Sequence, residues 1–215
     1  MKAYFRIMTV LAVVTLSAAP ALADLWNVND NISYTLSNAV WTPYGYGGLF
    51  TITDVDTGAV IETFCLELNE HISQNDRVAG ISDSASLGGR GGGSPDPISS
   101  ATDWLYTQFV YGNAAYSNGS ALQIAFWILE QEVTAAEASS WFNAGLLATA
   151  TSYLTEAKLH TGSYGTQVLN LKDDISDAPH QSQLFHPVPE PATMLLLGIG
   201  LIGLAGYGRK KLFKK

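Results

Sequence analysis

The sequence predicts an α+β fold, with a β-rich N-terminal half (hairpins forming a small sheet or sandwich) packed against a helical C-terminal half. Residues 25–69 alternate apolar and polar side chains around a glycine-ended turn, a pattern typical of paired strands. Residues 100–160 place apolar side chains at helical spacing after capping sequences. Each end of the chain carries an apolar segment with basic residues beside it, which indicates membrane targeting at both ends.

The N-terminal segment 1–23 has the three parts of a signal peptide. Lys2 and Arg6 precede an apolar run over residues 7–16, and the segment ends in Ala-Leu-Ala, the small residues that signal peptidase needs. The run is shorter than the ~20 residues that span a bilayer. We therefore expect cleavage before Asp24, with an uncleaved anchor as the alternative.

The first half of the body contains strand and loop patterns. Residues 31–40 alternate, and residues 49–53 and 59–66 flank the turn 54–58, which predicts a hairpin. The Asp-x-Asp-x-Gly of this turn lacks the other ligands of a calcium loop, so we expect a solvated turn. The Gly-, Ser- and Pro-rich residues 82–97 predict a flexible surface loop without a phosphate-binding motif.

The second half contains helix patterns. Residues 100–111 open with Ser-x-x-Asp, and residues 120–133 are strongly apolar. A capping box at residues 134–137 starts a helix that runs to about residue 160, with a break near residues 143–145. Residues 165–171 predict a final strand.

These patterns divide the chain into a signal peptide (1–23), an ectodomain (24–172), a polar linker (173–187) and a C-terminal tail (188–215). Without the two end segments the body holds 18 acidic and 4 basic residues, a net charge of −14. Such a surface repels polyanions, so no nucleic-acid partner is expected.

The tail combines a motif, an apolar helix and a basic cluster. Val188, Pro189, Glu190 and Pro191 precede the charge-free residues 192–207, about 24 Å long as a helix, and five basic residues follow. This order resembles the PEP-CTERM sorting signal; a permanent tail anchor is the alternative. The resemblance implies a Gram-negative host, a transmembrane helix before processing, an exosortase as processing partner, and delivery to the cell surface or an exopolysaccharide-rich extracellular matrix.

The body lacks the usual motifs of catalytic chemistry. It contains no Gly-x-Ser-x-Gly, His-Glu-x-x-His or Cys-x-x-Cys sequence. We expect no cofactor, no metal and no turnover enzyme. The single cysteine, Cys65, cannot form an internal disulfide and is either an inert buried thiol, an intermolecular link or a reactive group.

Two short segments resemble the thioester domains of bacterial surface adhesins. Phe64-Cys65-Leu66 matches the strand motif of an aromatic residue, Cys and an apolar residue, and Gln-Ile-Ala-Phe-Trp at residues 123–127 matches the helix motif. Leu122 stands where the family typically has Thr, and Gln108 is a poor candidate for the family's third motif.

The resemblance implies that Cys65 and Gln123 condense to an internal thioester, shielded from water by Phe64, Phe126 and Trp127. An amine or hydroxyl on a surface or matrix molecule would open it and become covalently attached. The protein would then be a covalent adhesin or a matrix cross-linker in a biofilm.

Other interpretations remain open. Gln123 could complete a capping box with Ser120, and Cys65 could be an ordinary core residue. The protein would then be a non-covalent structural component of the exopolysaccharide matrix. A secreted carbohydrate-active enzyme is a third hypothesis.

Overall fold

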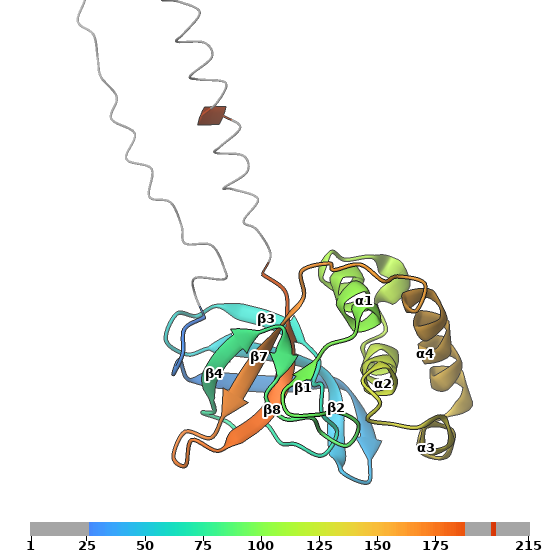
Figure 1. The fold of residues 1–215 in the computed structure, drawn as a ribbon, viewed down its shortest axis with the longest axis horizontal. Helices are drawn as coiled ribbons and strands as arrows, with labels where there is room; N and C mark the ends of the chain where they lie inside the picture. The colour runs from blue at the N-terminus through green and yellow to red at the C-terminus, as the bar shows by residue number, and fades with distance from the viewer. Residues whose placement is uncertain (1–25, 188–198, 201–215) are drawn as a thin grey trace, which may run out of the picture. The chain divides into compact units, whose positions relative to one another are not determined.

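The computed structural model describes residues 26–187 and 199–200. The described residues form a mixed α+β arrangement with three small antiparallel sheets and four α-helices (Figure 1). The expected signal peptide, sorting motif and most of the C-terminal helix lie outside the described residues. No helix within the described part is long and apolar enough to cross a membrane.

The first sheet contains the predicted hairpin. Strands β1 (Ile32–Thr42), β2 (Gly45–Asp54) and β3 (Val60–Thr63) pair in the order β1-β2-β3. Asp54 caps the β2–β3 turn because its carboxylate accepts hydrogen bonds from the backbone amides of Asp56 and Thr57. The Asp-x-Asp-x-Gly sequence is therefore a self-capped turn, and Asp54 itself is buried.

The second sheet contains a strand that the sequence pattern did not predict. Strands β4 (Arg77–Ser82), β7 (Gln167–Lys172) and β8 (Pro179–Phe185) pair in the order β4-β7-β8. The expectation of a polar linker over residues 173–187 is wrong for its second half, because β8 pairs with β7 and Leu184 is fully buried. The polar residues of β8, Gln181 to Gln183, are buried as well and are held largely by hydrogen bonds.

The glycine-rich loop is anchored to the fold. A two-strand sheet, β5 (Ser84–Ala85) with β6 (Asp96–Pro97), closes its base. The backbone amides of Arg90 and Gly91 donate to the buried carboxylate of Glu132 at 2.8 Å. The expectation of a flexible loop is therefore wrong for the centre of the segment, which is held by hydrogen bonds to Glu132.

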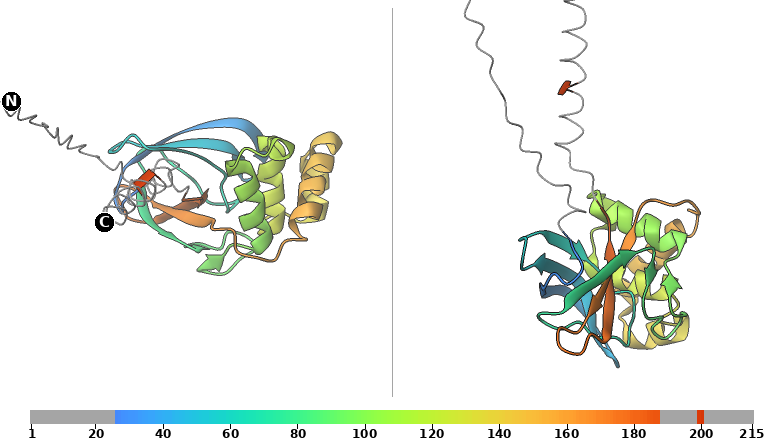
Figure 2. Two further views of the ribbon diagram at one scale, coloured as in Figure 1. Left: turned by 90° about the horizontal axis from the view of Figure 1, so that it is seen from above. Right: turned by 60° about the vertical axis from the view of Figure 1, so that its left-hand side comes forward.

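Four α-helices and one 3₁₀ helix form the second half: α1 (Ser100–Val110), η2 (Ala114–Tyr116), α2 (Gly119–Leu129), α3 (Ala135–Trp141) and α4 (Ala144–Ala157). The capping box of Thr134 and Glu137 is confirmed, as is the break before α4. Helix α2 packs against β1 and β2 on one side and α4 on the other (Figure 2). Its residues 121–127 are all buried, which explains why all of them except Gln123 are apolar.

Candidate functional site

The single cysteine and the glutamine of α2 lie together in the core, between the first sheet and α2. Cys65 follows β3 and forms an isolated bridge with Gln183 of β8. Sγ of Cys65 lies 3.4 Å from Oε1 of Gln123, although the residues are 58 positions apart. Because an amide C=O bond is about 1.23 Å long, the Cδ of Gln123 lies no farther than about 4.6 Å from the sulfur. Neither residue is accessible to solvent.

Three further hydrogen bonds orient the Gln123 amide. Its Oε1 accepts from the backbone N–H of Gly48 at 3.2 Å and from the backbone N–H of Cys65 at 3.3 Å. Its Nε2 donates to the carbonyl oxygen of Cys65 at 2.9 Å. Two N–H groups directed at one carbonyl oxygen are the arrangement of an oxyanion hole, which stabilises charge developing on that oxygen.

These contacts decide between two interpretations of Gln123. The N-terminus of α2 is capped by Asn118, whose side chain accepts from the backbone N–H of Ala121. Gln123 therefore does not form the alternative capping box with Ser120, whose hydroxyl donates to Asn38 instead. The glutamine side chain is directed into the core toward Cys65.

Aromatic side chains enclose the pair. Phe64, Phe126 and Trp127 are at most 1 % exposed, and the rings of Phe64 and Phe126 lie 5.1 Å apart. Among the described residues, the buried indole nitrogen of Trp127 has no hydrogen-bond partner. Burial strongly raises the pKa of the Cys65 thiol, the Glu67 carboxylate adds to this, and the Trp127 indole opposes it. A thiol in this environment stays protonated at neutral pH.

A pair of glycines in β2 lets this strand lie close to α2. The sequence-based prediction did not include these glycines in the site. A Cβ added at Gly47 would lie 2.4 Å from Cζ2 of Trp127 and 3.2 Å from Cγ of Gln123. Only a residue without a side chain lets the strand backbone lie against α2 here. The signal available in the sequence was Gly47-Gly48 inside an otherwise strand-like segment.

Gln108, the candidate for the third motif, does not join this site. It lies on α1, and its Oε1 accepts from the side chain of Asn113 at 3.0 Å. The structure thus brings together Cys65, Gln123, Phe64 and Trp127 and leaves Gln108 elsewhere.

One group among the described residues has ligand atoms close enough to hold a metal: Asp76, Asp173 and His180, within 4.8 Å of one another. Nδ1 of His180 already lies 2.9 Å from both carboxylate oxygens of Asp76. The Asp173 carboxylate accepts hydrogen bonds from Ile175 and Ser176 in its own turn. These contacts join β8 to the loop before β4, and we assign them to folding.

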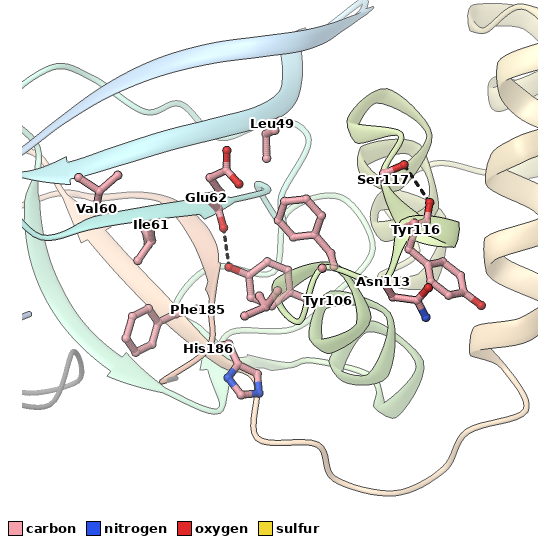
Figure 3. Close-up of a pocket in the computed structure, with 14 residues that line it drawn as sticks. Leu49, Val60, Ile61, Glu62, Tyr106, Asn113, Tyr116, Ser117, Phe185 and His186 are labelled. Atoms are coloured by element: carbon pink, nitrogen blue, oxygen red, sulfur yellow. Dashed lines mark hydrogen bonds between the residues drawn. The ribbon is translucent and has the colours of Figure 1, made fainter. Parts of the chain in front are cut away.

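A groove in the described part is lined by residues that neighbour those around the pair. Its volume is about 540 Å³, and Figure 3 shows its lining from β3, the end of α1, η2 and the end of β8. Leu49, which follows Gly48, lines it, as does Phe109, whose ring lies 5.1 Å from that of Phe64. Leu49 and Phe109 therefore connect the groove lining to residues next to the Cys65–Gln123 pair.

Comparison with protein families matches residues 187–210 to the PEP-CTERM protein-sorting motif. This motif implies an exported protein that an exosortase processes and that is sorted to the cell surface. No curated protein and no solved structure matches the chain. These comparisons therefore give no support to the resemblance with thioester domains.

Proposed function

We propose that Cys65 and Gln123 form an internal thioester, and that the exported protein uses it as a covalent adhesin or matrix cross-linker. The observation that carries the proposal is the amide of Gln123, held beside a buried thiol with two backbone N–H groups on its oxygen.

The chemistry balances without an oxidant or a cofactor. The sulfur of Cys65 attacks Cδ of Gln123, the Sγ–Cδ bond forms, the Cδ–Nε2 bond breaks, and ammonia leaves with the thiol proton. The N–H groups of Gly48 and Cys65 stabilise the negative charge on Oε1 during the attack.

Opening the thioester follows the same path in reverse with a different nucleophile. An amine on the partner attacks Cδ, a stable amide forms, and Cys65 returns to the thiol. The free indole N–H of Trp127 supports this step, because it can donate to the departing sulfur. Full burial of both residues supports a long-lived thioester, since hydrolysis requires water at Cδ.

Intact mass of the purified full chain tests the proposal. A thioester lowers the mass by about 17 Da, the mass of the ammonia lost in the acyl transfer, and methylamine then adds about 31 Da, so that the product is about 14 Da heavier than the sequence mass. Cys65→Ala and Gln123→Ala should each abolish the deficit and the amine capture.

Gln108→Ala is the matched control, because this glutamine lies on the neighbouring helix α1 and should leave the deficit unchanged. Wild-type protein with its full sequence mass, whose Cys65 reacts completely with iodoacetamide after denaturation, would leave the non-covalent matrix component as the better description.

A further inference from the structure

Within the described residues, the 540 Å³ groove contains a strand edge with no neighbouring strand. Strand β3 is the last strand of its sheet, and its residues Val60, Ile61 and Glu62 form one wall of the groove. Only the end of β3 and the residues after it reach β8, where Leu184 N–H donates to the Phe64 carbonyl. The first three residues of β3 therefore have a sheet neighbour on one side alone.

The hydrogen-bond register shows which backbone groups face the groove. Asp54 N–H donates to Ala59, and bonded and non-bonded pairs alternate along an antiparallel ladder. The pairs Thr53–Val60 and Thr51–Glu62 are therefore non-bonded. The N–H and C=O groups of Val60 and Glu62 point away from β2, and Tyr106 accordingly donates its hydroxyl to the Glu62 carbonyl at 2.8 Å (Figure 3).

Two polar side chains of the groove, those of Glu62 and His186, offer acceptor atoms to a ligand. Nε2 of His186 lies 3.1 Å from the carbonyl oxygen of Tyr164, and a carbonyl only accepts, so Nε2 carries the hydrogen. Nδ1 is an acceptor in the tautomer with the hydrogen on Nε2, and among the described residues it is buried without a hydrogen-bond partner; His186 is only 9 % exposed. The Glu62 carboxylate also lines the groove, and no Lys or Arg is among the described lining residues.

The rest of the lining combines apolar side chains with the polar side chains of Tyr106, Asn113, Tyr116 and Ser117. The apolar part is the floor of the groove and includes Ile61, Phe109, Val110 and Phe185. A ligand for this groove needs backbone donors and acceptors at strand spacing, apolar side chains for the floor, and a positive or donating group for Glu62 and His186. A body charge of −14 adds to the preference for a basic partner.

We propose that this groove binds an extended peptide segment of a partner protein, with apolar residues and a lysine or arginine, which adds to β3 as a fourth strand. Addition to a strand edge supplies main-chain hydrogen bonds, and the pockets beside it supply side-chain selectivity. The site does not depend on the thioester.

The test uses the full chain with Cys65→Ala in detergent micelles, so that no covalent capture contributes. The probes are acetyl-Thr-Val-Lys-Val-Thr-amide and its counterpart with glutamate in place of lysine, measured by calorimetry. We expect the lysine peptide to bind at least tenfold more tightly than the glutamate peptide. Glu62→Gln should reduce this ratio severalfold. Glu70 lies outside the groove, so Glu70→Gln is the control and should leave the ratio unchanged.

The strand edge is tested separately. Val60→Pro removes an N–H that faces the groove and leaves the bonds to β2 intact, so it should weaken the lysine peptide at least tenfold. If this variant does not fold by circular dichroism, N-methylation of the peptide's lysine amide makes the same test on unaltered protein.

Equal affinity for the two peptides, or unchanged affinity after both edge modifications, would overturn the proposal. Displacement of the lysine peptide by maltohexaose would assign the groove to a neutral glycan instead. Because Cys65→Ala protein is used throughout, these outcomes are independent of whether the thioester forms.

Discussion

At the scale of single residues, the site depends on groups that a sequence motif does not contain. The Gln123 oxygen is bound by the backbone of Gly48 and Cys65, and Trp127 covers it. Gly47 lets the strand approach this tryptophan, because any Cβ would collide with the indole ring. The carboxyl of Glu67, two residues after Cys65, is buried and adds to the raised pKa of the thiol.

Gly47→Ala should lower the free energy of unfolding by about 1–3 kcal/mol, because overpacking forces the strand away from α2. The same displacement should reduce the fraction of molecules that carry the ~17 Da mass deficit of the acyl transfer. Urea denaturation measures the first effect and mass spectrometry the second. Gly80→Ala is the control, since a Cβ at Gly80 meets no atom within 4 Å. Equal losses for both variants would contradict the packing argument.

Glu67 should make stability depend on pH. Burial raises the pKa of its carboxyl to about 8 from an ordinary value of 4.5. The folded state therefore holds the proton more tightly, so this contribution to stability is complete below pH 4.5 and is lost as pH rises toward 8. We expect the free energy of unfolding to fall between pH 5 and pH 8 by on the order of a few kcal/mol.

Glu67→Gln should flatten this slope, as followed by urea denaturation at each pH. Some slope should remain, because burial also raises the pKa of Glu130. A variant whose slope equals that of the wild type would show that Glu67 is already ionised in the folded protein at pH 5.

At the scale of elements, β8 completes the fold. It pairs with β7, its Ser182 accepts the Leu66 N–H, and its Leu184 donates to Phe64, so it fixes the segment that carries Cys65. The thiol is thus positioned by a strand more than 100 residues later in the chain. The tail is attached directly to this strand, because the family match begins at residue 187, two residues after β8 ends.

Leu184→Ala should cost about 2–5 kcal/mol of unfolding free energy, because the side chain is fully buried. Ile175→Ala, in the same segment but 88 % exposed, should change it by less than about 0.5 kcal/mol. Thermal and urea unfolding of both variants provide the measurement. Similar small effects at the two positions would restore the linker interpretation of residues 173–187.

At the scale of the whole molecule, the sorting motif and the thiol–amide pair lie in different parts of the chain. The motif match covers residues 187–210, and the thiol–amide pair lies in the preceding body. Of the 11 basic residues, five follow the apolar segment of the tail, so removing that tail leaves the strongly acidic body.

Replacing Val188 to Pro191 by alanines should leave the protein in the membrane fraction with its basic tail, in a host that has an exosortase. The wild-type protein should be found at the cell surface without peptides from residues 208–215, because processing occurs near the motif. Peptide mass spectrometry of the two fractions makes the comparison. Surface protein that still contains those tail peptides would contradict processing.

The sequence alone determined the strands β1 to β3, the helices, the capping box at Thr134 and the break before the last helix, because these depend on residues two to four positions apart. It also indicated the sorting tail, which is a linear address read without folding. Tertiary structure decided the rest. The polar residues of β8 are typical of a linker in the sequence. In the structure, β7 and the segment after Cys65 supply hydrogen-bond partners for the buried amides and hydroxyl of this strand. Likewise, Cys65 and Gln123 lie far apart in the sequence. Packing of β2 on α2, which Gly47 and Gly48 permit, brings the sulfur, the amide and two backbone N–H donors together in a buried site.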